Sequence, residues 1–240
     1  MADLPLALVT GAAHRLGKAF AVALARQGYA ILLHYHSGEG DAQRTSQELH
    51  SLGVPVFLKQ ADLRNTDQIA GLFSHLDTIP HKLKVLVNSA ALMTRADAYS
   101  QSVEEWDALF DLNLRAPFLL AQQAVSRMSE GGLIVNVTDV AAQKSWHVYP
   151  AYTVSKSALE SLTKVLARAF APAVRVNAIA PGLVLHSDIV SSEQWEKMVA
   201  RLPLKRPAGM DEIASALDFL VKNEYITGQT IVVDGGYSLI

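Results

Sequence analysis

The sequence has 240 residues, half of them hydrophobic, and its 21 basic and 23 acidic side chains leave a formal net charge of -2. This length suits one large α/β domain, and the evenly spread charge excludes a basic face for nucleic acid or an anionic membrane. The absence of cysteine excludes disulfides and thiolate catalysis, and no Cys/His spacing resembles a zinc site, so we expect no bound metal. No apolar run approaches the ~18 residues that span a bilayer and the N-terminus has no basic start, so we expect a cytosolic protein with a small-molecule partner.

Short apolar runs alternate with amphipathic stretches along the whole chain, which is typical of βαβ units in a parallel sheet. The predicted strands are Leu6–Thr10, Ala30–Tyr35, Val54–Lys59, Lys84–Asn88, Leu133–Val137, Val174–Ala180 and Thr230–Val233. The predicted helices cover about 15–28, 41–52, 66–76, 102–128, 151–170 and 210–221. We therefore predict a single α/β domain over 1–240, a Rossmann fold with a doubly wound, seven-stranded parallel sheet in the order 3-2-1-4-5-6-7 and helices on both faces. The longest non-periodic stretch, 183–209, is predicted to be a substrate lid or, alternatively, a passive surface excursion.

Two features beside the predicted strand ends suit a nucleotide. The turn Thr10–Gly17 joins the first strand to a helix, and the free N–H groups and dipole of a helix N-terminus favour a pyrophosphate. The same turn is also compatible with a simple tight connection. Asp62, just after the third strand, is placed either to accept a hydrogen bond from an adenine amino group or to cap the following helix.

The second strand ends in His34-Tyr35-His36-Ser37, without the acidic residue that would bind the ribose 2′-hydroxyl of NAD. Arg15, together with His36 and Ser37, could hold a 2′-phosphate through charge-assisted hydrogen bonds. These residues predict NADP(H) as the cofactor. The alternative is that Arg15 is a solvated loop charge and His34 a residue of the strand face.

Tyr152 and Lys156 are four residues apart, on one face of a helix that Pro150 can begin. Asp139 ends the fifth strand and Asn113 lies in the preceding long helix, so several elements contribute to one crevice. A lysine ammonium about 4 Å from a phenol contributes ~4 kcal/mol at an effective dielectric of ~20, which would bring the pKa of Tyr152 near neutrality. A phenol of this kind can transfer the proton while a cofactor carries the hydride. Taken alone, a tyrosine and a lysine on a helix are usually surface residues.

At these motifs the chain resembles the short-chain dehydrogenase/reductase family over essentially its full length. Thr10–Gly17 resembles the T-G-x-x-x-G-x-G turn, Asn88–Ala91 resembles N-N-A-G, and Tyr152–Lys156 is similar to Y-x-x-x-K. Pro181-Gly182 and Val233–Gly236 complete the pattern.

The resemblance implies a role for each of these residues. Asn113 would organise a water-linked proton relay, Tyr152 would be the acid/base, and Lys156 would also bind the nicotinamide ribose, while Pro181 and Gly182 would line the nicotinamide pocket. The predicted catalytic residues are thus Asn113, Asp139, Tyr152 and Lys156. The residues predicted to bind NADP(H) are Gly11, His14, Arg15, Leu16, Gly17, His34, His36, Ser37, Asp62, Leu63, Asn88, Ala90, Tyr152, Lys156, Pro181 and Gly182. The resemblance also implies a homotetramer, with the helices at 102–128 and 151–170 packed against symmetry mates.

Two departures from the family pattern narrow the expected substrate. Arg15 stands at the middle glycine of the turn and Asp139 at the position of the catalytic serine. Both resemble the pteridine-reductase branch, which includes bacterial dihydromonapterin and dihydrofolate reductase relatives. A neutral carboxyl beside Tyr152 can supply a proton toward a ring nitrogen, so the hypothesis is NADPH-dependent reduction of a C=N bond in a pterin.

A third departure concerns the substrate end of the crevice. Pterin-binding relatives place an aromatic residue after the N-N-A-like segment, where this chain has Met93. Met93, Trp146 and Leu183 are predicted to contact the substrate, although the first two are also compatible with simple packing. The alternative function is a carbonyl reductase of 3-oxoacyl thioesters or small ketones, and a more remote one is a non-catalytic NADP-binding protein.

Overall fold

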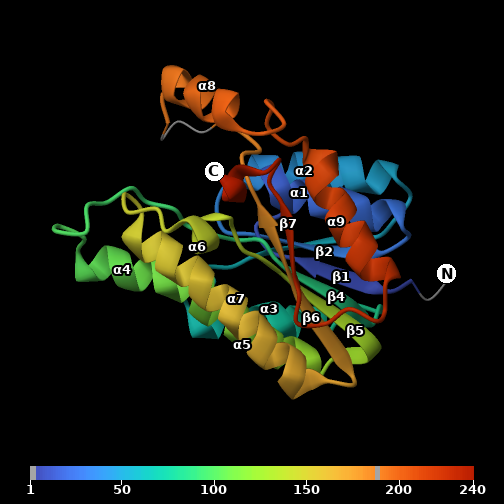
Figure 1. Cartoon of the computed structure of the whole chain (residues 1–240). Coiled ribbons are helices and arrows are strands. Elements are labelled where there is room, and N and C mark those ends of the chain that lie inside the picture. Colours follow the sequence, from blue (N-terminus) through green and yellow to red (C-terminus); the bar gives the residue numbers. More distant parts are fainter. Residues whose placement is uncertain (1–3, 187–189) are drawn as a thin grey trace.

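The structure is a computed structural model that describes residues 4–186 and 190–240. Its centre is one parallel sheet of seven strands in the order β3-β2-β1-β4-β5-β6-β7, which confirms the predicted fold and strand order (Figure 1). The strands are β1 Leu6–Val9, β2 Ala30–Tyr35, β3 Val56–Gln60, β4 Leu83–Asn88, β5 Met128–Val137, β6 Val174–Pro181 and β7 Thr230–Val233. The order reverses between β1 and β4, and ligand crevices of open α/β sheets lie at such a switch point.

Helices cover both faces of the sheet (Figure 1). They are α1 Arg15–Arg26, α2 Glu39–Ser51, α3 Thr66–Leu76, α4 Val103–Phe110, the π-helix η1 Asp111–Arg115, α5 Ala116–Val125, α6 Ala141–Lys144, α7 Pro150–Phe170, α8 Ser192–Arg201, α9 Met210–Lys222 and the 3₁₀ turn η2 Tyr237–Leu239. Helices α1, α2 and α9 share one buried apolar cluster with the sheet, and α3, α5 and α7 share the other. None of the described helices is both long and apolar enough to cross a membrane.

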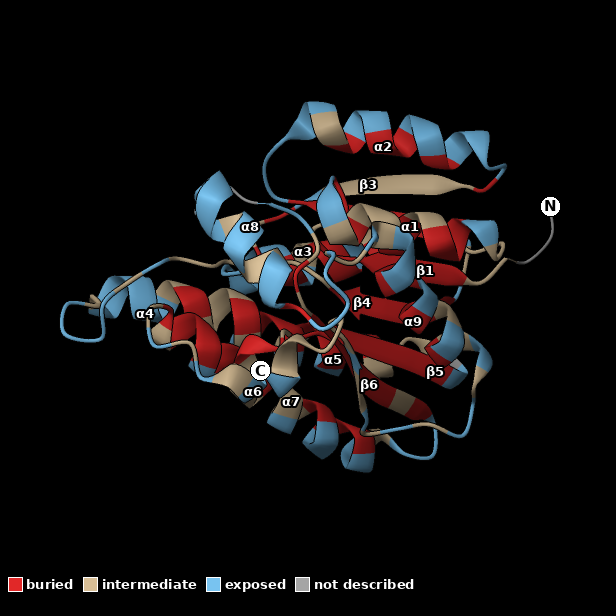
Figure 2. Ribbon diagram, turned by 45° about the horizontal axis from the view of Figure 1, so that its top comes forward, coloured by how far each residue is buried: buried red, intermediate tan, exposed pale blue. Residues whose placement is uncertain are grey.

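The strands are apolar on both sides because each side meets a helical layer. In β1, Ala7 and Val9 face the cluster under α1 and α9, whereas Leu6 and Leu8 face the cluster over α3 and α5. This alternation follows from the two-residue period of a strand. Figure 2 shows β1, β4 and β5 as buried and the outer faces of the surrounding helices as exposed.

The helix predicted over 102–128 is interrupted and ends earlier. It consists of α4, the π-helix η1 and α5, which ends at Val125. Pro117 lies in the first turn of α5 and has no N–H to donate to the carbonyl four residues earlier, that of Asn113. The sequence pattern missed this break because apolar residues continue on both sides of it. A π-helical turn inside a helix is often found at functional sites.

The segment 183–209, predicted to lack periodic structure, contains the helix α8, and its residues 187–189 lie outside the described residues. The Oγ of Ser191 caps it by accepting a hydrogen bond from the N–H of Gln194, at 3.3 Å. None of the residues of α8 is buried, because its apolar residues at helical spacing, such as Trp195 and Met198, line the cavity instead of packing in the core. The prediction missed this short periodic stretch. In Figure 1, α8 stands apart from the two layers of helices that cover the sheet.

The remaining differences concern element ends. Strand β5 begins at Met128 instead of Leu133, because Met128 pairs with Leu83 before an irregularity in the register. The short helix α6 was not predicted. It follows Asp139, whose Oδ1 accepts a hydrogen bond from the N–H of Ala141 at 2.8 Å. This is the local side-chain to backbone bond by which aspartate starts a helical turn.

Candidate active site

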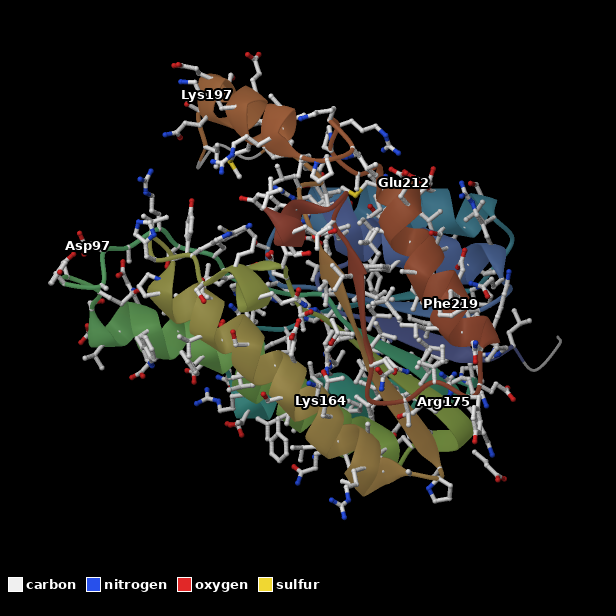
Figure 3. The ribbon with its side chains drawn as sticks, in the orientation of Figure 1. Asp97, Lys164, Arg175, Lys197, Glu212 and Phe219 are labelled. Carbon is white, nitrogen blue, oxygen red and sulfur yellow. The ribbon has the colours of Figure 1, made fainter. Side chains whose placement is uncertain are left out.

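A cavity of about 1140 Å³ lies at the carboxyl ends of the strands. Its wall includes the turn after β1, the ends of β2, β5 and β6, the start of α7 and part of α8. Figure 3 shows α8, which carries Lys197, on one side of the opening and the loop that carries Asp97 on another, and both segments contribute residues to the wall. Every predicted site residue except Asn88 and Asn113 lines this cavity.

The turn after β1 brings the N-terminus of α1 to the cavity. Gly11 has a φ of +62°, and a Cβ added to Gly17 would lie 2.2 Å from the carbonyl oxygen of Gly11, so both positions require glycine. His14, at the start of α1, makes no capping hydrogen bond with its side chain. The first turn of α1 also contains no acidic residue, which leaves its N–H groups available to an anion.

Arg15 occupies the position of the motif's middle glycine and keeps the backbone that a glycine would have. Its φ is 53°, one of three positive values among the described non-glycine residues. A left-handed conformation costs a non-glycine residue about 1–2 kcal/mol, so the backbone of the turn is fixed in a shape that glycine would adopt more easily. The side chain is exposed and lines the cavity next to Ser37 and His36.

His34 connects the turn to the end of β3. Its Nδ1 accepts a hydrogen bond from the N–H of Gly11 at 3.2 Å, and its Nε2 lies 3.0 Å from the carbonyl oxygen of Ala61. Burial lowers the pKa of His34 to about 4, so the ring is neutral at pH 7 and its Nε2–H donates to Ala61. Both ring nitrogens are therefore used by the backbone, which holds the turn in place. His34 also lines the cavity, and its predicted contact with the cofactor stays a prediction.

Asp62 faces the cavity but is paired with Arg64. The Nε and Nη2 atoms of Arg64 lie 3.0 Å and 2.8 Å from its two carboxylate oxygens, and these bonds lower the pKa of Asp62 to about 2. The possibility that Asp62 caps α3 is wrong, because the Oδ1 of Asn65 accepts from the N–H groups of Asp67 and Gln68. Contact with an adenine remains a prediction for Asp62, as it does for its neighbour Leu63.

Tyr152 is held against Asp139 at the floor of the cavity. The phenol Oη donates to Oδ2 of Asp139 at 2.7 Å. Lys156, one helical turn further along α7, points past the phenol, and its Nζ donates to the carbonyl oxygen of Val137 at 2.8 Å. Its Nζ lies 5.8 Å from the centre of the Tyr152 ring. The side chains of Tyr152 and Lys156 are buried, so both belong to the interior of the site instead of the helix surface.

The electrostatics of this group differ from the sequence-based expectation. Burial raises the pKa of Asp139, and burial together with the adjacent Asp139 raises the pKa of Tyr152 well above its usual value. Burial lowers the pKa of Lys156 to about 8, which leaves the ammonium charged at pH 7. The predicted fall in the pKa of Tyr152 is wrong because burial disfavours the charged phenolate and the adjacent Asp139 adds to that effect. A carboxyl with a raised pKa beside a phenol is arranged to hold a proton and to deliver it.

Asn113 is buried and does not line the cavity itself, but it is hydrogen-bonded to Leu92, which does. Its amide Nδ2 donates to the carbonyl oxygen of Leu92 at 2.9 Å, and its Oδ1 accepts from the N–H of the same residue at 2.9 Å. Nδ2 also donates to Oγ of Ser155 at 3.1 Å. The side chain thus ties the segment that contains Met93 to η1 and α7. The water-linked proton relay predicted for Asn113 stays a prediction. The main-chain carbonyl oxygen of Asn113, to which Pro117 has no N–H to donate, is the group that would bind the water.

Asn88 takes a different position from the predicted one. It is 3% exposed, does not line the cavity, and donates from Nδ2 to Oδ1 of Asn136 at 2.8 Å, which links β4 to β5. The adjacent Ser89 and Ala90 donate their N–H groups to Oγ1 of Thr10, at 2.9 Å and 3.0 Å. The side chains of Asn88 and Thr10 therefore connect the ends of β1, β4 and β5. The residues of this motif that line the cavity are the ones after Asn88.

The substrate end of the cavity contains the predicted Met93, Trp146 and Leu183. It also contains Tyr149, which precedes the catalytic tyrosine as Trp146 does, and residues that no sequence motif identified, namely Trp195, Met198 and Tyr237. The last three belong to α8 and to η2, two elements whose convergence depends on the fold. Within the described residues, no three His, Asp or Glu side chains are grouped to hold a metal ion.

Comparisons with known proteins agree with this geometry. Residues 11–238 match the family model described as enoyl-(acyl carrier protein) reductase. The 3-oxoacyl-(acyl-carrier-protein) reductase FabG of Staphylococcus aureus is 33% identical over 237 residues, covering 96% of each chain. FolM alternative dihydrofolate reductase 1 from Brucella canis, complexed with NADP, has a TM-score of 0.94 at 33% identity and covers 100% of this chain and 96% of that one.

A second solved structure, acetoin dehydrogenase YohF from Salmonella typhimurium, has a TM-score of 0.88 at 32% identity and covers 98% of each chain. Each relative spans nearly the whole chain, so the likeness extends to the turn after β1, to α7 and to the C-terminal segment. With Tyr152 and Lys156 in the interior of the cavity and the sheet order as observed, the chain belongs to the short-chain dehydrogenase/reductase family.

Proposed function

We propose that this protein is an NADPH-dependent reductase of a pteridine-type substrate, acting on a C=N bond of a dihydropterin or dihydrofolate. The observation that carries the proposal is the 2.7 Å hydrogen bond between Tyr152 and Asp139, at the position where the family has a serine. A serine hydroxyl orients a carbonyl oxygen, whereas a carboxyl with a raised pKa can give a proton to a ring nitrogen. The FolM neighbour, named as a dihydrofolate reductase, supports the same substrate class.

The residues around the turn after β1 fit NADP(H). The open N-terminus of α1 suits the pyrophosphate, and glycine at positions 11 and 17 lets the turn pack closely on Ala90 and on itself. Arg15, His36 and Ser37 line the same part of the cavity and suit the 2′-phosphate. The carboxylate nearest to them, Asp62, is neutralised by Arg64. The neighbours complexed with NADP or NADPH support this cofactor.

The catalytic residues then have separate tasks. The bound nicotinamide supplies the hydride. Asp139 is the group that holds a proton in the buried site, because burial raises its pKa. The phenol of Tyr152 gives its own proton to the substrate nitrogen and takes up the proton of the carboxyl to which it is hydrogen-bonded. Lys156, charged at pH 7, provides a positive group next to the phenol and the cofactor ribose. The proton lost to the substrate nitrogen is replaced from water, for which the carbonyl of Asn113 offers a binding point.

A carbonyl reductase of 3-oxoacyl thioesters or small ketones is the second candidate. The similarity to FabG and to acetoin dehydrogenase favours it, and so does the presence of Met93 where pterin-binding relatives have an aromatic ring. The retained Tyr152 and Lys156 weigh against a protein that binds NADP without catalysis.

The test is NADPH oxidation, followed at the nicotinamide absorbance, with dihydrobiopterin, dihydrofolate and acetoacetyl thioester in parallel. We expect turnover of a pterin substrate with NADPH and much slower turnover with NADH. Turnover of the thioester alone would replace the proposal by the carbonyl reductase. Tight NADPH binding without turnover of any of the three would favour the non-catalytic alternative.

The preference for NADPH is expected to depend on Arg15. Arg15→Ala removes a charge-assisted hydrogen bond worth about 1.5–3 kcal/mol and should raise the Kd for NADPH roughly ten- to a hundred-fold, with little change for NADH. Both constants are measured by titration of nicotinamide fluorescence. Arg15→Gly tolerates the φ of 53°, so a loss common to both variants belongs to the guanidinium.

Arg26→Ala, at the other end of α1, is the matched control and should bind both cofactors as the wild type does. An equal loss of NADPH and NADH affinity in the Arg15 variants would contradict recognition of the 2′-phosphate.

The rest of the proposal concerns assembly and the cavity opening. Phe118 on α5 and Val154 and Val165 on α7 are exposed apolar side chains, which supports packing of these helices in a cytosolic homotetramer. The segment 183–209, with α8 at its centre, is proposed as the substrate lid of the single domain because Trp195 and Met198 line the cavity.

A further inference from the structure

The C-terminal turn η2 is fixed by side-chain hydrogen bonds and by a close backbone contact. The carboxylate of Asp234 accepts hydrogen bonds from the N–H groups of Gly236, at 2.9 Å, and Ser238, at 2.7 Å. Gly236 has a φ of +85°, and a Cβ at this position would lie 2.6 Å from Cγ of Pro203, so the turn packs directly on the segment that follows α8. The position of Tyr237, between these residues, is therefore determined by the backbone.

Lys144, at the end of α6, connects the turn η2 to the helix that follows Asp139. Its Nζ donates to the carbonyl oxygen of Tyr237 at 2.9 Å and also to the main-chain oxygen of Ile240. The same Nζ lies 4.6 Å from the centre of the Tyr237 ring, within the range of a cation–π contact. Helix α6 starts at the residue bonded to Asp139, so this contact couples the turn to the catalytic carboxyl through five residues of chain.

Tyr237 lines the cavity next to the reacting groups. Its ring centre lies 6.1 Å from that of Trp146, at an interplanar angle of 52°, and Trp146 is 6.0 Å from Tyr149. Burial raises the pKa of Tyr237, against a smaller lowering by Arg201 and with a smaller contribution from Asp139, so the phenol stays neutral at pH 7. Three aromatic rings thus form one continuous wall beside Tyr152 and Asp139.

We propose that Tyr237 is a specificity-determining residue of the substrate site, whose ring, with that of Trp146, packs on a flat heteroaromatic substrate. This inference rests on the proposed pterin reductase function and supplies the aromatic surface that Met93 does not provide. A planar ring gains offset or edge contacts with such a wall, whereas a flexible 3-oxoacyl chain gains only apolar area. Lys144 is the positioning residue that keeps the ring in place.

The test compares steady-state constants for dihydrobiopterin and acetoacetyl thioester. Tyr237→Leu, which keeps much of the apolar volume, should raise the KM for the pterin by about ten-fold while kcat changes less than about two-fold, because the contact is made equally before and during reaction. The KM for the thioester should stay near its wild-type value. Tyr237→Phe should behave as the wild type, because it retains the ring.

Lys144→Met is expected to raise the KM for the pterin by about three-fold, and Lys144→Arg to restore it, which a general loss of folding would not do. Tyr225→Ala, which removes a fully exposed tyrosine, is the matched control. An unchanged NADPH Kd in all variants shows that the cofactor end is intact.

The outcomes separate this inference from the proposed function. A wild-type enzyme without pterin turnover would remove the proposed function and the ring contact with it. A wild-type enzyme that reduces the pterin, with a Tyr237→Leu variant of unchanged KM, would overturn only the role of Tyr237. Equal losses on the pterin and the thioester would also overturn it, because they would mean that Tyr237 does not distinguish a flat ring.

Discussion

Replacing Tyr152 by phenylalanine is expected to lower kcat for reduction of the pterin by roughly 10²–10⁴-fold. The variant keeps the ring and its packing in the buried site but removes the oxygen that lies 2.7 Å from Oδ2 of Asp139. The proton held by the carboxyl then has no phenol through which to reach the substrate. Stopped-flow measurement of NADPH oxidation gives the rate of the chemical step.

Binding separates this loss from a loss of structure. The Kd of Tyr152→Phe for NADPH should change less than about three-fold, because the turn after β1 and the N-terminus of α1 are untouched. Tyr99→Phe is the matched control, since Tyr99 is fully exposed in the loop before α4. A Tyr152→Phe variant with more than a tenth of the wild-type kcat would show that Asp139 or water donates the proton directly.

The fold could be predicted because its main signals are local and repeated. Apolar strands such as β1 and β2 alternate with amphipathic helices such as α1 and α3, and parallel strands of this kind have few possible arrangements. The two exceptions have different causes. Helix α8 carries Trp195 and Met198 at helical spacing, but these residues line the cavity and the prediction missed this short periodic stretch. The break at η1 lies between two apolar segments and leaves the hydrophobic period unchanged.

The candidate site could be predicted only as far as its motifs extend. The turn after β1 and the pair Tyr152 and Lys156 are contiguous in sequence, and the structure places both in the cavity wall. The role of each polar atom depended on neighbours distant in sequence. His34 is occupied by Gly11 and Ala61, and the pKa of Tyr152 is raised by its burial and by Asp139.

The same limitation explains why no sequence motif identified Tyr237. Tyr237 reaches the cavity because η2 folds back from β7 onto the segment after α8 and is bonded to Lys144. Lys144 and Tyr237 are 93 positions apart, and no sequence motif connects them. Loop-borne substrate contacts of this kind follow from the packing of several elements, so they vary within a family while the catalytic motif stays recognisable.

Replacing Asp139 by serine is expected to separate the two candidate functions. The variant restores the residue type that the family pattern has at this position and removes the carboxyl whose pKa burial raises. Turnover of dihydrobiopterin should fall at least about a hundred-fold, because a serine hydroxyl cannot donate a proton to a ring nitrogen at neutral pH. Turnover of acetoacetyl thioester should be retained or increased, because that reaction needs only a hydroxyl to orient the carbonyl.

Asp139→Asn tests the charge separately from the size. It preserves the shape of the side chain and can still bond to Tyr152, but it cannot transfer a proton, so it should lose pterin turnover as the serine variant does. Asp107→Ser, on the exposed face of α4, is the matched control for the loss of one acidic residue. Full pterin activity in Asp139→Ser would mean that Tyr152 alone completes the proton transfer and that the departure from the family serine does not specify the substrate. Activity on the thioester in Asp139→Ser but not in the wild type would instead mean that this one carboxyl separates the pterin reductases from the carbonyl reductases that share this site.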